Sequence, residues 1–189
     1  MPGIDPSRQF VPLKIAVLTV SDTRERADDK SGNLLAERIR AAGHTLAERA
    51  IVKDDVEAIR QHVKSWIADN FIDVVITTGG TGFTGRDVTP EAVEPLFEKK
   101  MDGFSMMFLL VSEKKIGTSA IQTRATAGVA NATYIFCLPG SPGACADAWD
   151  EILVQQLDYR YRPCNFVEIL PRLDEHMRRP KAKAKGARA

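Results

Sequence analysis

Short apolar runs alternate along this chain with stretches whose apolar residues recur every three or four positions. Runs rich in β-branched residues are typical of buried strands in a parallel sheet. Five runs predict strands: residues 13–20, 45–52 (the weakest), 73–78, 120–124 and 133–138. Residues 125–131 are expected to be the link between the last two.

Amphipathic stretches between these runs predict helices. The five ranges are residues 31–42, 54–67, 89–100, 103–115 and 144–157. Ser31 and Thr89 are expected to be N-caps, and Pro90 suits a first helical turn. Residues 103–115 hold so many bulky apolar side chains that we expect burial on more than one side. The sequence leaves open whether the helix packs inside one chain or against another copy, and the bulky residues favour an interface between copies.

Alternating strands and helices predict a single α/β domain. We expect a three-layer α/β/α sandwich, Rossmann-like, with a mostly parallel sheet and right-handed crossovers. Residues 1–12 would be a flexible lead-in and residues 13–170 the folded domain. The basic residues of 171–189 would form a disordered tail.

Composition narrows the class of protein. The 189 residues carry a net charge of +1, which gives no sign of a nucleic-acid partner. Three widely spaced cysteines suit reduced thiols in the cytoplasm, and no apolar run is long enough to span a membrane. The three histidines have no partners in sequence and are expected to be exposed.

The loop at residues 77–91 carries the clearest chemistry. Four of the seven residues from Gly79 to Gly85 are glycines, and a helix is expected to follow. Glycines let backbone N–H groups approach a ligand, and such groups near a helix N-terminus bind anions. The pattern predicts a phosphate-binding loop with one acid, Asp87.

Polar residues also follow three other predicted strands. These are Ser21 with Asp22, Asp54, and Gly140 with Ser141. Ligands of parallel sheets bind at the carboxyl ends of the strands. If the strands are parallel, all these groups and the glycine loop lie along one edge.

The glycines also match a dinucleotide fingerprint, G-x-G-x-x-G, from Gly80 to Gly85. That interpretation is disfavoured because the loop follows the third strand and its glycines do not open the helix. No strand ending in Asp or Glu follows about 20 residues later. A Walker lysine is absent too, since Arg86 follows Gly85.

The combination of segments resembles the MoaB/MogA family of molybdenum cofactor biosynthesis, over about residues 13–170. The segments that carry the resemblance are Val20-Ser21-Asp22, residues 28–32, 51–55 and 77–92, Arg124 ahead of Gly128, and residues 138–142. Residues 127–131 and 162–166 look more like the MoaB branch.

The resemblance implies a molybdopterin adenylyltransferase, which converts ATP and molybdopterin into adenylyl-molybdopterin and pyrophosphate. The two essential acids of the family match Asp54 and Asp87. Lys53 departs from the proline common in active members. Trimers or hexamers are implied, and other enzymes of the pathway are possible partners.

A site that joins two polyanions must offset the negative charge of their phosphates and align the attack on the α-phosphorus. A metal ion that bridges phosphate oxygens helps with both tasks. Mg²⁺ binds one or two carboxylates together with phosphates and water, so Asp87 and Asp54 are the candidate metal ligands and catalytic acids. The remaining candidates would bind nucleotide or substrate: Ser21, Asp22, Thr78, Gly79, Gly80, Thr81, Gly82, Arg86, Thr89, Arg124, Gly140 and Ser141.

Several of these residues also have purely structural interpretations. Asp54 with Glu57 has the form of a capping box, which the residues alone favour. Asp87 and the Ser21–Asp22 pair fit ordinary turns, Gly140 and Ser141 fit a helix entry, and Arg124 fits a surface ion pair.

Two other functions stay open. One is a protein that binds molybdopterin or a nucleotide, or acts as a scaffold in the pathway, without turnover. The retained carboxylates disfavour it, because acids weaken polyanion binding unless a metal is present. The other is an oxidoreductase of Rossmann-like fold.

Overall fold

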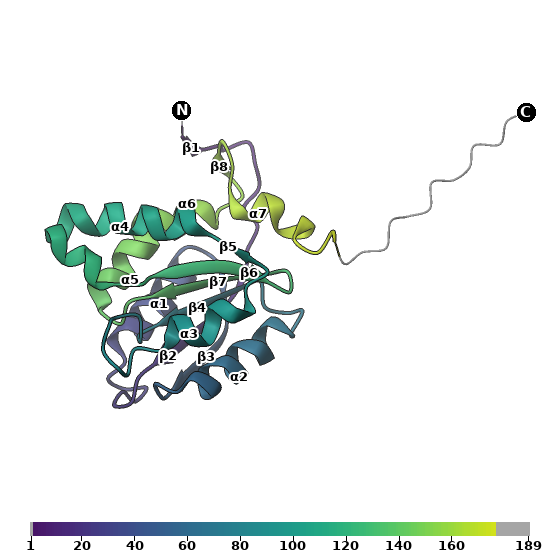
Figure 1. Cartoon of the computed structure of the whole chain (residues 1–189). Helices are drawn as coiled ribbons and strands as arrows, with labels where there is room; N and C mark the ends of the chain where they lie inside the picture. The colour runs from purple at the N-terminus through teal and green to yellow at the C-terminus, as the bar shows by residue number, and fades with distance from the viewer. Residues whose placement is uncertain (1, 177–189) are drawn as a thin grey trace, which may run out of the picture.

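The computed structural model describes residues 2–176 and confirms the three-layer sandwich (Figure 1). The main sheet has six strands in the order β3-β2-β4-β7-β6-β5. The strands are β2 (Lys14–Val20), β3 (Thr45–Val52), β4 (Val74–Thr78), β5 (Lys99–Lys100), β6 (Thr126–Ala130) and β7 (Thr133–Leu138). The first four in the sheet order are parallel, and β6 is antiparallel to its neighbours. The prediction of a mostly parallel sheet is therefore confirmed.

Helices cover both faces of this sheet. One face carries α1 (Lys30–Ala41), α4 (Asp102–Ile116) and a helical stretch formed by α5 (Pro142–Ala148), a π-helical turn (Trp149–Leu153) and α6 (Val154–Gln156). The other face carries α2 (Val56–Ile67) and α3 (Thr89–Val93). Strand residues alternate between the two layers, so that Ile15 packs on the first face and Ala16 on the second. This double burial explains why the strands are continuously apolar.

A separate two-stranded sheet lies outside the sandwich. β1 (Gly3–Ile4) pairs antiparallel with β8 (Tyr161–Arg162), so the N-terminal segment predicted to be flexible contains a strand. α7 (Phe166–Ile169) and a 3₁₀ turn (Leu170–Arg172) follow β8. The part of the basic tail at residues 177–189 lies outside the described residues. Within residues 2–176, no helix is both long and apolar enough to cross a membrane.

The strand predicted at residues 120–124 is wrong. That region is a 3₁₀ helix (Gly117–Gln122), and β6 lies in the stretch expected to be a link. β6 turns into β7 through Asn131 and Ala132, which both have positive φ, of 46° and 61°. Tight hairpin turns favour such angles, so the two strands run antiparallel. At Gly128 a Cβ atom would lie 2.4 Å from the Phe97 ring, so packing requires glycine there.

The helix predicted at residues 89–100 is also too long. α3 ends at Val93, a 3₁₀ turn (Glu94–Leu96) follows, and the chain then enters β5. Pro95 explains the end, because its ring removes an N–H donor and clashes with the preceding turn. Arg60 donates to the carbonyls of Glu91 and Ala92 near this end.

α4 differs from expectation in its burial. Phe104 and Phe108 pack into the core, but the single chain buries only one side of the helix, so the predicted burial on more than one side does not occur inside one chain. The side chains of Met106 and Leu110 are 66% and 56% exposed. α4 therefore presents an apolar face outward.

His44, expected to be exposed, is buried between two aromatic rings. It is 6% exposed, lies 5.1 Å from the Phe10 ring and 6.4 Å from the Trp149 ring, and its Nδ1 accepts a hydrogen bond from the N–H of Leu13. Burial lowers the pKa of His44 from 6.5 to about 4, although the charge of Asp158 opposes this shift. The folded protein therefore holds His44 neutral.

We expect His44 to make stability depend on pH. The unfolded state takes up a proton near pH 6.5 and the folded state only near pH 4, so the free energy of unfolding falls as pH is lowered through this window. His44→Asn keeps an acceptor but does not titrate, so its urea midpoint should fall less between pH 7 and pH 4.5. His176→Asn is the control, since His176 is an exposed histidine near Glu98. Identical pH profiles for wild type and His44→Asn would contradict this prediction.

Candidate functional site

The parallel register brings four loops together at one edge of the sheet. Val20 pairs with Val52, Thr19 with Thr78, and Thr78 with Leu138. The segments that follow these strands contain Ser21 and Asp22, Asp54, Gly79 to Asp87, and Gly140 and Ser141. The structure thus brings the predicted groups to one edge.

The glycine loop is packed too tightly for side chains at its first two positions. Gly79 has φ of +106°, and a Cβ there would lie 2.2 Å from the carbonyl oxygen of Val20. Gly80 has φ of +65°, and a Cβ there would lie 2.4 Å from Oγ1 of Thr89 and 3.2 Å from Oδ1 of Asp54. Both positions combine positive φ with close contact, so they require glycine.

Thr89 locks this loop and does not cap α3, which corrects the predicted cap. Its hydroxyl donates to the carbonyl of Gly79 at 2.8 Å, and its N–H donates to the carbonyl of Gly80 at 2.9 Å. Val88 occupies the N-cap position without a side-chain hydrogen bond. Thr89 therefore acts as a clamp on the loop.

Two of the four predicted phosphate donors in the loop backbone are already used. The N–H of Gly79 donates to the carbonyl of Leu138, and the N–H of Gly82 faces the Asp87 carboxylate, whose pKa it helps to lower. No hydrogen bond among residues 2–176 uses the N–H of Gly80 or the N–H of Thr81. These two donors remain for an anion.

The hydroxyls predicted to bind ligand also contact the protein itself. The Thr78 hydroxyl donates to the carbonyl of Pro139, and the Thr81 hydroxyl pairs with that of Thr123. Ser21 accepts N–H bonds from the turn that follows it, and Ser141 caps α5 by accepting from the N–H of Ala144. These side chains shape the loops.

Asp87 is held inside its own loop. Its carboxylate accepts from the N–H of Thr84 at 2.9 Å and from the Thr84 hydroxyl at 2.6 Å. Burial opposes ionisation, but these hydrogen bonds, that of Gly82 and the charge of Arg124 keep the pKa of Asp87 below its usual range. Asp87 is therefore an oriented, ionised carboxylate.

Asp54 does not cap α2, so the capping-box interpretation is wrong. Asp55 is the N-cap, and its side chain accepts from the N–H of Ala58 at 2.8 Å. Asp54 instead lies beside Gly80. Burial and the negative charges of Asp22 and Asp87 raise the pKa of Asp54 above its ordinary value. A cation at this position would relieve that repulsion.

Asp22 links three of the converging loops. Its Oδ1 accepts from the N–H of Asp54 at 3.2 Å, and its Oδ2 accepts from Nε and Nη2 of Arg86 at 2.9 and 2.6 Å. The hydrogen bonds with Arg86 lower the pKa of Asp22. Asp22 and Arg86, both predicted to face the ligand, face each other here.

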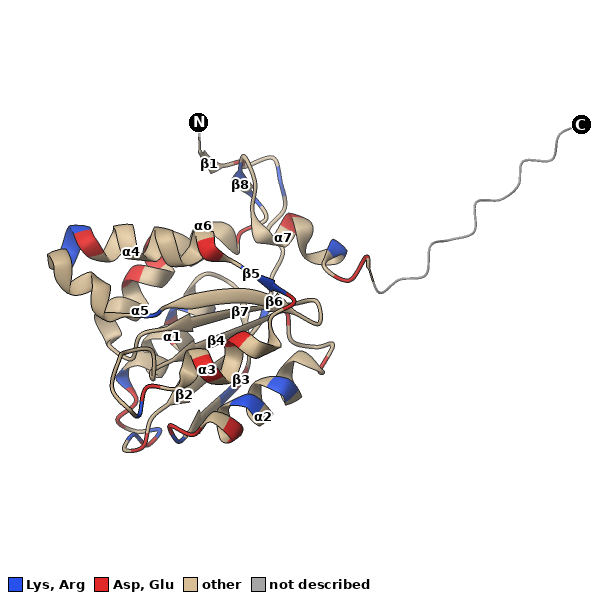
Figure 2. Ribbon diagram, viewed as in Figure 1, with Lys and Arg blue, Asp and Glu red and all other residues tan. Residues whose placement is uncertain are grey.

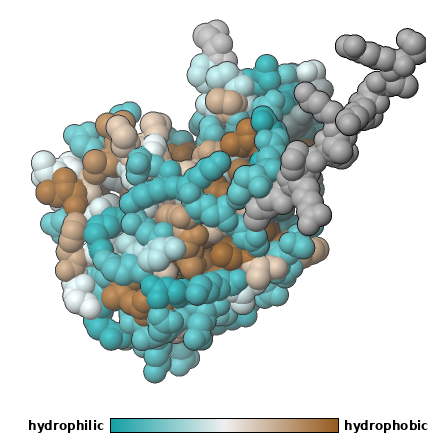
Figure 3. All heavy atoms as spheres, turned by 45° about the vertical axis from the view of Figure 1, so that its right-hand side comes forward, coloured by the Kyte–Doolittle hydropathy of each residue, from teal (hydrophilic) through white to brown (hydrophobic). Residues whose placement is uncertain are grey.

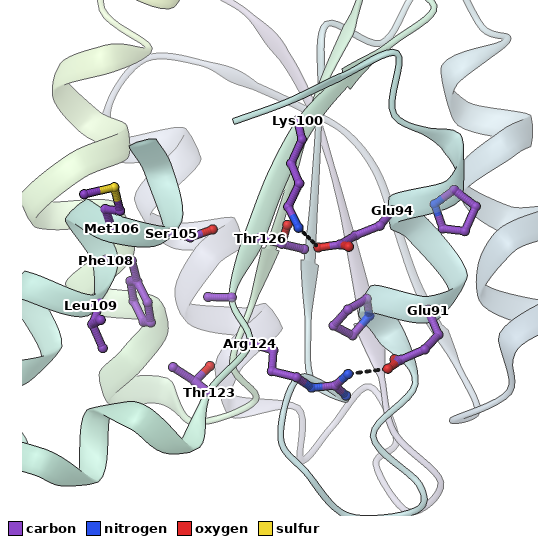
Figure 4. A pocket seen from close by; sticks show the side chains of 13 residues that line it. Glu91, Glu94, Lys100, Ser105, Met106, Phe108, Leu109, Thr123, Arg124 and Thr126 are labelled. Carbon is purple, nitrogen blue, oxygen red and sulfur yellow. Dashed lines mark hydrogen bonds and ion pairs between the residues drawn. The ribbon is translucent and has the colours of Figure 1, made fainter. Parts of the chain in front are cut away.

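Arg124 holds the far side of the glycine loop. Its Nε donates to the carbonyl of Gly82 and its Nη2 to the carbonyl of Asp87, both at 2.8 Å. Its Nη1 pairs with Glu91, as Figure 4 shows. The guanidinium predicted to bind phosphate is thus directed at the loop backbone.

The motif at residues 28–32 has a role that sequence reasoning missed. Asp29 caps α1 by accepting from the N–H of Gly32, so the predicted Ser31 cap is wrong. The buried Asp29 carboxylate also accepts from the Thr19 hydroxyl and from Arg49, each at 2.7 Å. The Ser31 hydroxyl donates to the carbonyl of Gly140. No local pattern marks a contact between residues 20 positions apart.

A cavity of about 510 Å³ opens between these groups. Its lining consists of Thr19, Val20, Ser21, Arg24, Asp29, Lys30, Ser31, Asp54, Thr78, Gly79, Gly80, Gly140 and Pro142. A larger cavity of about 620 Å³ lies between α3 and α4 (Figure 4). Its charged side chains are paired with one another, Lys100 with Glu94 and Arg124 with Glu91. The smaller cavity, which is lined by Asp54, Gly79 and Gly80 but not by Asp87, is therefore the better candidate for a phosphate ligand.

The donor set suits Mg²⁺ only when phosphate shares the coordination. Among residues 2–176 there is no group of three or more His, Cys, Asp or Glu side chains arranged to hold a metal. Mg²⁺ usually takes one or two carboxylates, with phosphate and water as its other ligands. Asp54 and Asp87 provide such carboxylates on either side of the glycine loop.

Comparisons with known proteins identify the family of this chain. The family model described as "Probable molybdopterin binding domain" matches residues 16–159. The chain is 50% identical over 160 residues to molybdenum cofactor biosynthesis protein B of Escherichia coli (strain K12), covering 85% of this chain and 94% of that protein.

Two solved structures are similar as well. A crystal structure of molybdenum cofactor biosynthesis protein B has a TM-score of 0.80 and 37% identity, covering 89% of this chain and 99% of that one. The tungsten cofactor synthesizing protein MoaB from Pyrococcus furiosus has a TM-score of 0.65 and 37% identity, covering 76% of this chain and 92% of that one.

The contacts of Arg124 predict that it orders the glycine loop. Arg124→Lys cannot span two carbonyls and Glu91, so amide hydrogen exchange at residues 82–88 should become about tenfold faster. Arg38→Lys is the control, because Arg38 makes a similar two-pronged contact with Asp150 elsewhere. Unchanged exchange at residues 82–88 in Arg124→Lys would show that Arg124 does not hold the loop.

Proposed function

Because this chain belongs to the MoaB/MogA family and takes part in molybdenum cofactor biosynthesis, we propose that it is a molybdopterin adenylyltransferase. In the proposed reaction, an oxygen of molybdopterin attacks the α-phosphorus of ATP. A new P–O bond forms, the bond to the β-phosphate oxygen breaks, and pyrophosphate leaves. The products are adenylyl-molybdopterin and pyrophosphate, formed in the cytoplasm.

One observation carries this proposal: two carboxylates from different strand ends flank a loop with unused backbone donors. Asp54 lies beside Gly80, Asp87 closes the loop, and the N–H groups of Gly80 and Thr81 remain unpaired within residues 2–176. A site that binds polyanions without a metal gains nothing from added carboxylates. The acids therefore favour a metal-nucleotide complex over simple anion binding.

Each group then has a proposed role. Gly80 and Thr81 donate to phosphate oxygens, and the packing of Gly79 and Thr89 fixes the direction of those donors. Asp54 and Asp87 would hold Mg²⁺, which offsets phosphate charge when it is bound. Positioning and electrostatic stabilisation supply most of the rate enhancement in such reactions.

The two acids give the direct test of the proposed reaction. Asp87→Asn and Asp54→Asn each remove a charge with little change of shape, so molybdopterin-dependent transfer of AMP from ATP should fall about 100-fold or more in each. Asp55→Asn is the matched control, because it changes the neighbouring acid and keeps a good helix cap. The readout is labelled AMP transferred to molybdopterin. Wild-type turnover in Asp87→Asn would remove that residue from the mechanism.

We also propose that the chain assembles with itself through α4. Between Gly103 and Ser112 this helix has no charged residue, and Figure 2 draws its middle in tan. Met106, Met107, Leu109 and Leu110 are exposed on it. Figure 3 shows brown hydrophobic atoms at the surface in several places on the face that it draws. Large exposed apolar patches mark interaction sites.

The assembly would be a trimer or hexamer of the 20.8 kDa chain, measurable by light scattering. Leu110→Glu places a charge on the apolar face, so its mass should drop towards that of one chain. Phe71→Glu is the control, since Phe71 is similarly exposed, at 54% against 56%, but lies away from α4. A wild type that scatters as a single chain would contradict the proposal.

A further inference from the structure

The ion pair between Arg86 and Asp22 has the features of a temporary contact. The Arg86 side chain is 66% exposed, yet its Nε and Nη2 both donate to one carboxylate oxygen of Asp22. Exposed ion pairs contribute little to stability, because water and salt screen them. The pair can therefore be exchanged for a stronger partner at low cost.

Gly85, which precedes Arg86, is under less steric constraint than the earlier glycines of the segment. Gly79, Gly80 and Gly82 are each constrained by close neighbours. At Gly85, in contrast, a Cβ atom would meet nothing within 4 Å and φ is not in the left-handed region. No steric need explains a glycine beside Arg86. The turn from Thr84 to Asp87 is held by hydrogen bonds, so any redirection falls to the exposed Arg86 side chain itself.

Arg86 is also a cation shared by the acids of the site. The carboxylates of Asp22, Asp54 and Asp55 all act on its guanidinium, and its charge in turn counteracts the repulsion that Asp54 experiences from Asp22 and Asp87. The positive charge of Lys53 also stabilises the ionised Asp22, and the positive charge of Arg124 stabilises the ionised Asp87. Arg86 thus partly performs the electrostatic task that a divalent cation would perform at Asp54.

We propose that Arg86 is an exchangeable internal counter-ion. Without nucleotide it neutralises Asp22 and screens Asp54. When a nucleoside triphosphate enters, the guanidinium moves to the phosphates, which bind it in a bidentate way and carry more charge than one carboxylate. Asp22 and Asp54 then lose their counter-ion beside the divalent cation that Asp54 and Asp87 would hold. The identity of the anion rests on the proposed function, but the counter-ion role does not.

Mn²⁺ binding to the nucleotide-free protein tests the counter-ion role, with free Mn²⁺ followed by electron paramagnetic resonance. Arg86→Met removes the charge and keeps an unbranched side chain, so Mn²⁺ should bind about tenfold more tightly than to wild type. Arg86→Lys keeps the charge and should stay near wild type. Arg26→Met, which removes a charge from the exposed neighbouring loop, should also stay near wild type.

A double variant separates this role from a structural one. Asp22→Asn in the Arg86→Met background removes the carboxylate that Arg86 had neutralised, so the tighter Mn²⁺ binding should be lost. A merely structural Arg86 would make Mn²⁺ binding weaker or leave it unchanged in Arg86→Met. Either of those results would overturn the proposal.

The phosphate half is tested by ATP affinity in the presence of Mg²⁺. Arg86→Met should bind ATP about tenfold more weakly than wild type, opposite in direction to its effect on Mn²⁺. Equal ATP affinities would overturn the movement to phosphate. Absence of ATP binding in the wild type would refute that movement and the proposed function together, while the Mn²⁺ titrations would still decide the counter-ion role.

Discussion

The contact between Gly79 and the carbonyl of Val20 is the constraint on which the site depends. It places the loop after β4 directly against the end of β2, at a distance that no side chain permits. Gly80 then comes to lie against Thr89 and Asp54, and Gly140 lies against Gly79 from the β7 side. One close backbone contact thus brings the acid after β3 and the acid after β4 to the same loop.

Groups near the loop divide into those that build it and those that remain for a ligand. Thr78, Thr89 and Arg124 direct their polar atoms to backbone carbonyls, so they fix geometry. The N–H groups of Gly80 and Thr81, and the carboxylate of Asp54 beside Gly80, are the polar groups that remain for a ligand. This division explains why several residues of plausible binding chemistry turn out to be structural, and why the larger cavity, whose charges are paired internally, is the weaker candidate for a polyanion.

The sequence predicted the parallel strands well because burial on both faces makes them continuous apolar runs. β6 was missed because Ala127 and Gly128 have weak strand preferences, and antiparallel pairing through a tight turn defines the strand. The caps were misassigned wherever adjacent polar residues compete. Asp29 and Ser31 are one example, Asp54 and Asp55 another, and only the three-dimensional contacts decide between them. His44 and the Asp29–Arg49 pair depend on contacts with residues distant in sequence, which no local pattern contains.

The central claim is that the glycine loop and the acids form one site for a metal-bound nucleotide. Calorimetric titrations with ATP and, separately, with NADH, each with and without Mg²⁺, test it most directly. We expect one ATP per chain, bound much more tightly with Mg²⁺, and no binding of NADH. Tight NADH binding together with no Mg²⁺-dependent binding of ATP would contradict the claim.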